Sequence, residues 1–330
     1  MLRPLWSICV MLPLAMVAGS KALAADPIFP AGARLETLWE DGEFTEGVAA
    51  APDGRIYFSD ITESVPGRIL RFDPRSRETV VHSADSGKSN GLDFDGQGRL
   101  IAACGANDGR QALCEITPDG QVRPLVERFE GRRFNAPNDL AVHPRGWIYF
   151  SDPRYVGSEP IEIDHMSVYR FDPETQAVVR VTRDISKPNG VIIAPDGGTL
   201  YVAETDNGAP DVPGAGSGGG RKKMTLNAFP IADDGALGER RILRDFGQET
   251  GIDGMTVDDQ GRIYGAVRAE SRFGIGVFDP QSGEELAFLP TATLPTNCTF
   301  GRGDESQLLY VTAGTGLYRI RVNARRGGPR

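Results

Sequence analysis

A short polar segment recurs six times along the chain, and each copy places a side-chain oxygen just before an apolar run. The six residues are Glu46, Asn90, Asn138, Asn189, Asp253 and Asn297. Carboxylate and amide oxygens are the ligands that hard cations such as Ca²⁺, Mg²⁺ and Mn²⁺ prefer. Two carboxylates would formally neutralise one dication, and without it their mutual repulsion would raise the pKa of one of them. If the fold brings these positions together, they predict a site for one divalent cation.

Each segment also has a simpler interpretation, because Asn-Gly and Asp-Gly are ordinary turn sequences. That interpretation is sufficient for any single copy. It would, however, readily admit Ser or Gly-Gly in some copies, whereas all six carry a carboxylate or an amide. Recurrence across the repeat therefore favours metal binding over six unrelated turns.

The polar residues each open a longer repeating unit of strand, turn, strand, polar loop and strand. The units are Gly47 to Pro74, Leu92 to Ile101, Leu140 to Pro173, Val191 to Val202, Met255 to Pro280, and Cys298 to Ile320. They recur at roughly 45 to 60 residues, a blade-sized period, and long helical periodicity is absent. An open β-solenoid would normally have shorter coils. The pattern predicts an all-β, six-bladed β-propeller.

The last unit supplies only three clear strands, so we expect the segment from Ala33 to Glu40 to complete it and close the ring. The Gly/Pro-rich stretch from Gly208 to Gly220 is predicted to be a surface loop, because the repeat register resumes after it. The innermost strand of each blade lines the channel of a propeller. Equivalent positions in six blades therefore form a ring around the axis, which would gather the six polar residues.

The chain opens with a pattern typical of a signal peptide. Arg3 precedes a short apolar run, and Ala22-Leu-Ala24 resembles a cleavage site, so residues 1–25 are predicted to be removed near Ala24 or Ala25. Residues 26–330 are then expected to form one domain, exported to the periplasm or secreted. No later stretch is long enough for a transmembrane helix or anchor. The net charge of −9 argues against nucleic-acid binding, and the oligomeric state stays open, a monomer being compatible.

Three cysteines follow the predicted cleavage site. Cys104 and Cys114 flank a polar stretch and could face each other on adjacent strands, so a disulfide and two free thiols both stay open. Cys298 is expected to be a buried thiol, since no histidine pattern around it suggests activation.

Beyond the repeat, six segments resemble the SMP-30/gluconolactonase/regucalcin family over almost the whole chain. They are Phe44-Thr-Glu-Gly47, Arg133-Phe-Asn-Ala-Pro-Asn-Asp139, Tyr149-Phe-Ser-Asp-Pro153, Lys187-Pro-Asn-Gly190, Asp253-Gly-Met255 and Pro295-Thr-Asn-Cys-Thr-Phe-Gly301. The resemblance implies a six-bladed propeller with a divalent metal in its channel. It also implies lactone hydrolysis or, as in some relatives, organophosphate hydrolysis.

Carried over by motif, the resemblance assigns Glu46, Asn189 and Asp253 to the metal, and Asn138 to metal or substrate. Asp253 also matches the carboxylate that handles protons in the family. Many bacterial members place an acidic residue and a histidine after the cysteine that matches Cys104. This chain has Cys104-Gly-Ala-Asn-Asp108 instead, so the particular lactone stays open.

Further substrate contacts are expected from the other ring asparagines and from the loop after Asp152. The ring supplies Asn90 and Asn297. The loop places Arg154 and Tyr155 where they could bind substrate hydroxyls, and a purely structural role in a surface loop stays open for both.

Together these observations predict a metal-dependent hydrolase that opens a small-molecule sugar lactone by water attack on a cation-polarised carbonyl. The cation is expected to be Ca²⁺, with Mg²⁺, Mn²⁺ and Zn²⁺ as alternatives. No Gly-x-Ser-x-Gly elbow is present, which argues against a serine esterase. Two rivals stay open: a non-catalytic, calcium-stabilised binding module, and a hydrolase of other esters or phosphotriesters. A channel with two carboxylates favours the enzyme, because a purely structural channel needs no charged lining.

Overall fold

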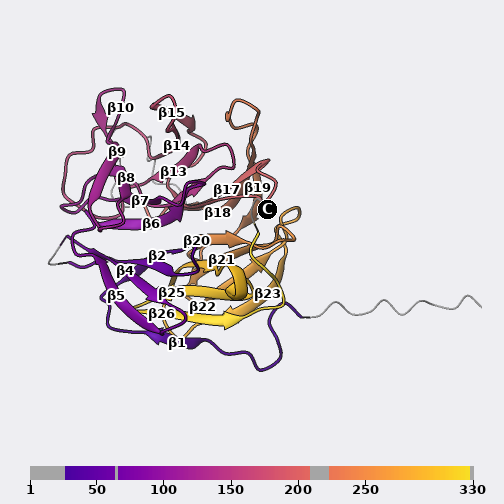
Figure 1. Ribbon diagram of the computed structural model, residues 1–330. Coiled ribbons are helices and arrows are strands. Elements are labelled where there is room, and N and C mark those ends of the chain that lie inside the picture. The colour runs from indigo at the N-terminus through magenta and orange to yellow at the C-terminus, as the bar shows by residue number, and fades with distance from the viewer. Residues whose placement is uncertain (1–26, 64–65, 209–222, 328–330) are drawn as a thin grey trace, which may run out of the picture.

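The computed structural model describes residues 27–63, 66–208 and 223–327, and these form six four-stranded antiparallel sheets (Figure 1). The predicted signal peptide and nearly all of the predicted Gly/Pro-rich loop lie outside the described residues. The only helix among the described residues is a 3₁₀ turn at Gly303–Glu305. No helix in this part of the chain is long and apolar enough to cross a lipid bilayer.

The first three blades are built from strands β2 to β15, together with a small ribbon of β10 and β11. Their bounds are β2 Thr45–Ala50, β3 Ile56–Asp60, β4 Arg68–Asp73 and β5 Glu78–Ser83; β6 Ser89–Phe94, β7 Leu100–Cys104, β8 Ala112–Ile116 and β9 Val122–Val126; β10 Arg128–Phe129 and β11 Arg132–Arg133; β12 Leu140–Val142, β13 Ile148–Asp152, β14 Ser167–Asp172 and β15 Ala177–Thr182.

The last three blades follow in chain order, and the sixth borrows its outer strand from the start of the described chain. Their bounds are β16 Pro188–Ile193, β17 Thr199–Thr205, β18 Met224–Pro230 and β19 Arg241–Asp245; β20 Ile252–Val257, β21 Ile263–Ala269, β22 Arg272–Phe278 and β23 Glu285–Pro290; β24 Pro295–Phe300, β25 Leu308–Ala313, β26 Gly316–Arg321 and β1 Glu36–Trp39.

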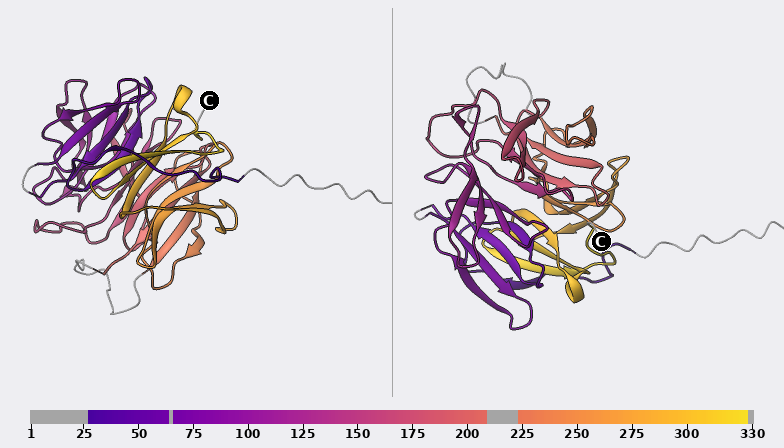
Figure 2. Two further views of the ribbon diagram at one scale, coloured as in Figure 1. Left: turned by 90° about the horizontal axis from the view of Figure 1, so that it is seen from below. Right: turned by 45° about the horizontal axis from the view of Figure 1, so that its top comes forward.

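The innermost strands close a complete circle. Each of β2, β6, β12, β16, β20 and β24 contacts the next, and β24 contacts β2. The indigo strand β1 lies beside yellow β26 in Figure 1, and Figure 2 shows the blades from two further sides. The β1–β26 register pairs Glu36 with Arg319 and Thr37 with Tyr318. The prediction of a six-bladed propeller closed by an N-terminal strand is confirmed.

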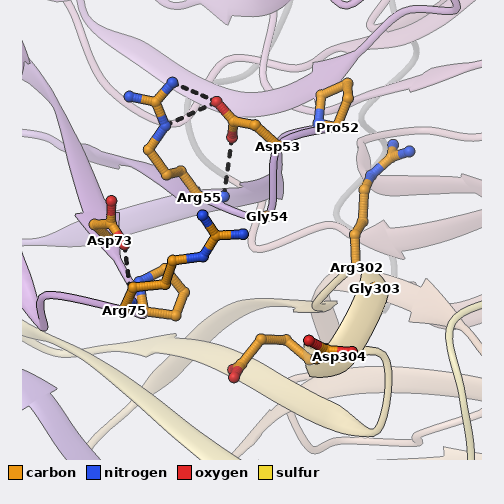
Figure 3. Close-up of a pocket in the computed structure, with 11 residues that line it drawn as sticks. Pro52, Asp53, Gly54, Arg55, Asp73, Arg75, Arg302, Gly303 and Asp304 are labelled. Atoms are coloured by element: carbon orange, nitrogen blue, oxygen red, sulfur yellow. Dashed lines mark hydrogen bonds and ion pairs between the residues drawn. The ribbon is translucent and has the colours of Figure 1, made fainter.

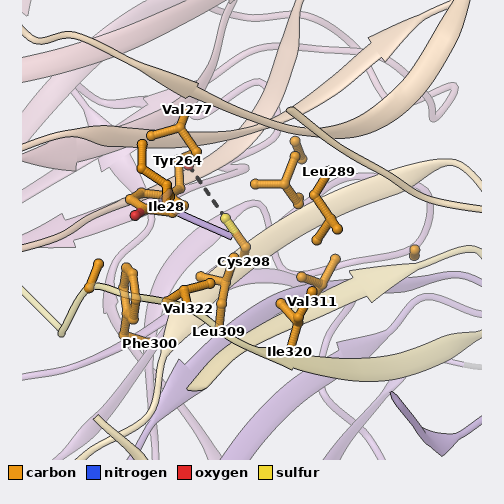
Figure 4. Close-up of a cluster of buried hydrophobic side chains, with 14 residues drawn as sticks. Ile28, Tyr264, Val277, Leu289, Cys298, Phe300, Leu309, Val311, Ile320 and Val322 are labelled. Atoms are coloured by element: carbon orange, nitrogen blue, oxygen red, sulfur yellow. Dashed lines mark hydrogen bonds between the residues drawn. The ribbon is translucent and has the colours of Figure 1, made fainter. Parts of the chain in front are cut away.

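Hydrophobic side chains between neighbouring blades form the core. The inner strand β2 and the second strand β3 are buried along their whole length, whereas the outer strand β5 is largely exposed. Between blades 5 and 6, side chains of both sheets interlock, with Tyr264 meeting Phe300 edge-to-face at 5.1 Å (Figure 4). Burial of this kind is the main favourable term in folding, so it fixes the blades and thereby the channel.

The three described cysteines are buried free thiols. Cys104 pairs with Ala112 across β7 and β8, and Cys114 pairs with Ala102, so the two thiols are diagonal rather than directly opposed. The sequence left a disulfide open here, and the structure has none. Cys298 packs in the core between blades 5 and 6, where burial raises the pKa of its thiol, as expected for an unreactive cysteine.

Glycines allow the inner strands to approach each other near the axis. A Cβ at Gly190 would lie 2.1 Å from the carbonyl oxygen of Asp253, and one at Gly47 would lie 2.0 Å from that of Asn90. Strand pairing also shifts register at this point in β2, β6, β16, β20 and β24. Such bulges re-aim side chains. The glycine of the recurrent segments therefore serves close packing and a bulge, not a hairpin turn.

We expect Gly190→Ala to lower the free energy of unfolding by about 2 kcal/mol, because the added methyl group overlaps backbone that has little room to move. Urea unfolding measures the change. Gly96→Ala is the matched control, since a Cβ there meets no atom within 4 Å. Equal stability of the two variants would contradict the role assigned to Gly190.

The C-terminal segment lies at the other end of the inner strands. The Arg326 backbone forms a bridge with Asp258, and its Nη1 donates to the carbonyl oxygen of Phe300 at 3.2 Å. Burial raises the pKa of Asp93, on the inner strand of blade 2, and the positive charge of Arg326 partly opposes that rise. The C-terminal segment is therefore bonded to blades 5 and 6 at this end.

Candidate metal and substrate site

A cavity of about 510 Å³ opens at the N-terminal ends of the inner strands. Five of the six recurrent polar residues line it, each from a different blade. They are Glu46, Asn90, Asn138, Asn189 and Asp253. The circular repeat therefore brings together residues that lie up to two hundred positions apart in the chain.

Asn297, predicted to bind substrate, does not line this cavity. Its Oδ1 accepts a hydrogen bond from the Cys298 backbone N–H at 2.8 Å, and its amide covers Gly254, where a Cβ would lie 2.1 Å from Asn297 Cγ. The side chain is used to satisfy backbone and to fill space beside blade 5. The structure thus places Asn297 outside the cavity lining, and its role in substrate binding stays a prediction.

Arg154 was expected to bind substrate hydroxyls and is instead a buried structural residue. Its side chain is 1% exposed and is absent from the cavity lining. Nε donates to the carbonyl oxygen of Asn135 at 3.0 Å, and Nη1 pairs with Glu159 at 3.2 Å. These bonds hold the loop after β13 against the loop before β12, so the contribution of Arg154 to the site is indirect.

Tyr155 does line the cavity. Its hydroxyl donates to the carbonyl oxygen of Thr205 at 3.0 Å, and the Lys187 ammonium lies 5.0 Å from its ring centre. Both contacts fix the ring, which presents a rigid wall to a ligand.

Glu46 and Asp253 place two carboxyl groups in a desolvated setting, each residue being less than 5% exposed. Burial, followed by the charge of Asp253, raises the pKa of Glu46 well above its usual range. Burial also raises the pKa of Asp253, while Arg268 opposes that rise. Two like charges out of water repel each other, and a cation between them would relieve both costs.

Asn189 supplies the third donor. Its Oδ1 is buried and has no hydrogen-bond partner, an uncommon state for a buried amide. Its side chain also hydrogen-bonds Asp253. Two carboxylates and an unpartnered amide oxygen match the ligands of a hard divalent cation. No group of three or more His, Cys, Asp or Glu suited to a metal occurs in the described ranges.

Sequence reasoning missed two positively charged side chains that line the cavity, Lys88 and Arg268. Arg268 lies near the end of β21, and its Nη1 pairs with Asp253 Oδ2 at 2.5 Å. Lys88 directly precedes the recurrent Ser89-Asn90 segment. Asn107, from the segment that departs from the family pattern, also lines the cavity and supplies an amide there.

Asp152, at the end of β13, clamps the loop that carries Asn138. Its two carboxyl oxygens accept the backbone N–H groups of Asn135 and Ala136 at 2.9 and 2.7 Å. Burial nevertheless raises its pKa from 3.8 to about 7. The folded protein therefore binds this proton more tightly than the unfolded chain does, and the stability gained is lost as pH rises from about 4 to 7.

The Asp152→Asn variant, which resembles the protonated acid, is expected to remove this pH dependence. The wild-type free energy of unfolding should fall relative to that of the variant, by up to about 1.4 kcal/mol per pH unit in this window. Urea titrations between pH 4.5 and 7.5 measure the difference. Parallel pH profiles would show that Asp152 binds its proton equally in both states.

A second hollow, of about 580 Å³, lies at the opposite end of β2 from Glu46 (Figure 3). Among its charged side chains, Arg55 pairs with Asp53, and Asp73 accepts the Arg75 backbone N–H at 2.8 Å. The recurrent polar residues line the channel cavity and not this hollow, so the channel cavity is the better candidate for chemistry.

Fold and cavity together define a class: a six-bladed propeller with an oxygen-lined pocket at its axis. Residues 44–315 match the model of the SMP-30/Gluconolactonase/LRE-like region, and the chain belongs to that family. A gluconolactonase of Zymomonas mobilis is 27% identical over 327 residues, covering 90% of this chain and 83% of that protein.

Two solved structures support the same placement. A gluconolactonase from Xanthomonas campestris is 30% identical with a TM-score of 0.73, covering 88% of this chain and 90% of that one. The calcium-binding protein regucalcin from Agrobacterium tumefaciens has a TM-score of 0.68 at 20% identity, covering 92% and 97%, and shows the shared fold. The relatives support lactone hydrolysis as the function.

Proposed function

We propose that the protein is a divalent-metal-dependent lactonase that opens a sugar lactone to its hydroxy acid. The observation that carries the proposal is the convergence of Glu46, Asp253 and the unpartnered Oδ1 of Asn189 in one cavity. The gluconolactonases among the relatives support the choice of a lactone as substrate.

Glu46, Asn189 and Asp253 would hold the cation, with Asn138 beside them as a further oxygen donor or a substrate contact. The cation would supply Lewis acidity to polarise the lactone carbonyl and to stabilise the negative charge that develops on its oxygen. We propose Ca²⁺ for this position, with Mg²⁺, Mn²⁺ and Zn²⁺ as the alternatives to be compared.

The amides of Asn90 and Asn138, together with the ring of Tyr155, would orient the sugar within the cavity. Attack of water on the carbonyl carbon forms a new C–O bond, and the ring C–O bond then breaks. Asp253 is the proposed acceptor of the proton that water loses, and it returns that proton to the departing ring oxygen. Arg268, paired with Asp253, keeps that carboxylate in place.

Hydrolysis of glucono-δ-lactone, followed with a pH indicator, tests the proposal. Turnover above the spontaneous rate is expected from the purified protein, loss of it after chelation, and recovery on addition of one of the four cations. A panel of simple esters and phosphotriesters serves as the comparison. Absence of metal-dependent turnover on any lactone would overturn the proposal.

A further inference from the structure

The charges of the cavity wall are not balanced once a dication is counted. Glu46 and Asp253 are the only carboxylates among the described residues that line the cavity, and together they formally neutralise one divalent cation. Arg268 and Lys88 line the same cavity. Even with Arg268 counted alone, the lining residues and one dication carry one positive charge in excess, and a partly desolvated pocket makes such an excess costly unless a ligand offsets it.

Arg268 is the stronger of the two features. Its side chain reaches the cavity from β21 and stays about a quarter exposed, with Asp253 4% exposed beside it. It touches Asp253 through one nitrogen, and among the described residues its guanidinium donates to no other acceptor. A guanidinium offers five N–H donors in a planar fork that suits a carboxylate, sulfonate or phosphate.

An ion pair with Asp253 does not by itself account for this arginine. When the Asp253 carboxylate coordinates the cation, part of its negative charge is neutralised, and its ion pair with the Arg268 guanidinium becomes weaker. An arginine needed only to neutralise Asp253 would therefore compete with the cation. An anionic group on the substrate would remove this competition, because it would accept hydrogen bonds from the Arg268 guanidinium while Asp253 coordinates the cation.

Lys88 extends the same feature to another blade. It is 5% exposed and lies just before β6, and its Nζ donates to the carbonyl oxygen of Thr62, which anchors the ammonium in the wall. Tyr155 and Asn107 line the same cavity and offer an aromatic ring and an amide to a hydroxylated chain.

We propose that the substrate is a sugar lactone that bears a second, permanently anionic group, and that Arg268 binds this group. The inference rests on the proposed lactonase function and names its substrate class. A carboxylate, a sulfonate or a phosphate could each bind the guanidinium in this way, so the experiment compares lactones that carry each of these groups.

The test compares kcat/KM for neutral D-glucono-δ-lactone with that for D-glucaro-1,4-lactone, 6-sulfo-6-deoxygluconolactone and 6-phosphogluconolactone. At least one acidic lactone is expected to be preferred by about tenfold or more, and the preferred member identifies the anion. Arg268→Gln should abolish the preference, mainly by raising KM for the acidic lactone, while Arg268→Lys should retain part of it. Arg272→Gln is the matched control, because that arginine pairs with Glu285 outside the cavity.

Equilibrium binding gives a readout independent of turnover. In calorimetry with cation-loaded protein, glucarate and 6-phosphogluconate, which each carry a second anionic group, should be tested against gluconate, which carries only one. One of the two acids with a second anionic group should bind more tightly, and added salt and Arg268→Gln should each reduce the difference. Lys88→Gln, measured in parallel, provides a second variant if Arg268→Gln does not fold.

The two proposals fail in different ways. Equal or better turnover of the neutral lactone, together with an Arg268→Gln loss that is the same for all substrates, would overturn the anionic substrate and leave the lactonase intact. Failure to hydrolyse any lactone with any of the four cations would overturn the lactonase, and this inference with it.

Discussion

Replacing Glu46 with glutamine is expected to reduce lactone turnover by about 10³-fold or more while making the chelator-treated protein harder to melt. In the proposed mechanism turnover falls because the cation would lose one of its two carboxylate ligands. Stability rises because burial and the neighbouring Asp253 raise the pKa of Glu46, so its charged form is costly without a cation. The folded state holds that proton more tightly than the unfolded chain, so the stability cost grows as pH rises.

The gain in Tm from Glu46→Gln should therefore be larger at pH 8 than at pH 5, and calorimetry at both values checks it. Each kcal/mol corresponds to roughly 3 °C for a domain of this size. Glu43→Gln, an exposed acid three residues away, is the matched control and should change neither quantity. Unchanged turnover in Glu46→Gln would remove Glu46 from the site, and a lower Tm in chelator would remove the electrostatic explanation.

Starting the chain at Asp41 instead of residue 27 is expected to lower the Tm by about 10 °C or to cause aggregation. The truncation removes β1, which closes blade 6, and with it Trp39, whose ring packs on Phe58 at 5.4 Å. Trp39 is partly buried, so its loss alone is expected to cost about 1–3 kcal/mol. The open edge of β26 would also become a template for strand pairing between molecules.

A synthetic peptide covering residues 27–42 should restore part of the lost stability by adding the missing strand in trans. Glu36→Ala is the control, since it removes only the half-exposed pairs with Arg77 and Arg319, worth less than about 1 kcal/mol each. A truncated chain that melts with the intact one would show that closure contributes little.

The fold was predictable because repetition encodes it. Six similar units with one polar position each can satisfy their edges by closing into a ring, and in a ring equivalent residues must meet. This reasoning placed Glu46, Asn90, Asn138, Asn189 and Asp253 correctly in one cavity. It also located the closing strand, since the last unit lacked one.

Asn297 shows where that reasoning ends. Equivalence along the repeat fixes the position of a Cα, but side-chain direction depends on local backbone and on the next residue. In blade 6 the amide turns back to its own Cys298 N–H and fills the space above Gly254. No feature of the sequence distinguished this asparagine from the others.

Arg268 was missed for a different reason. The alignment compared inner strands, whereas Arg268 sits on the second strand of blade 5 and reaches past it. Its signal was present as a single arginine within the otherwise apolar run from Ile263 to Ala269, where a charge needs a buried partner. For Arg154 the sequence left two roles open, and in the structure its guanidinium donates to the backbone carbonyl oxygens of Asn135 and Glu159.

The position of the C-terminal segment bears on how substrate and product enter and leave the channel. Arg326 and its neighbours occupy the end opposite the cavity, where they bond to the last residues of β20 and β24. If the proposed lactonase releases its hydroxy acid through the same opening that admits the lactone, accumulated product is expected to act as a competitive inhibitor, which initial rates at increasing product concentration measure.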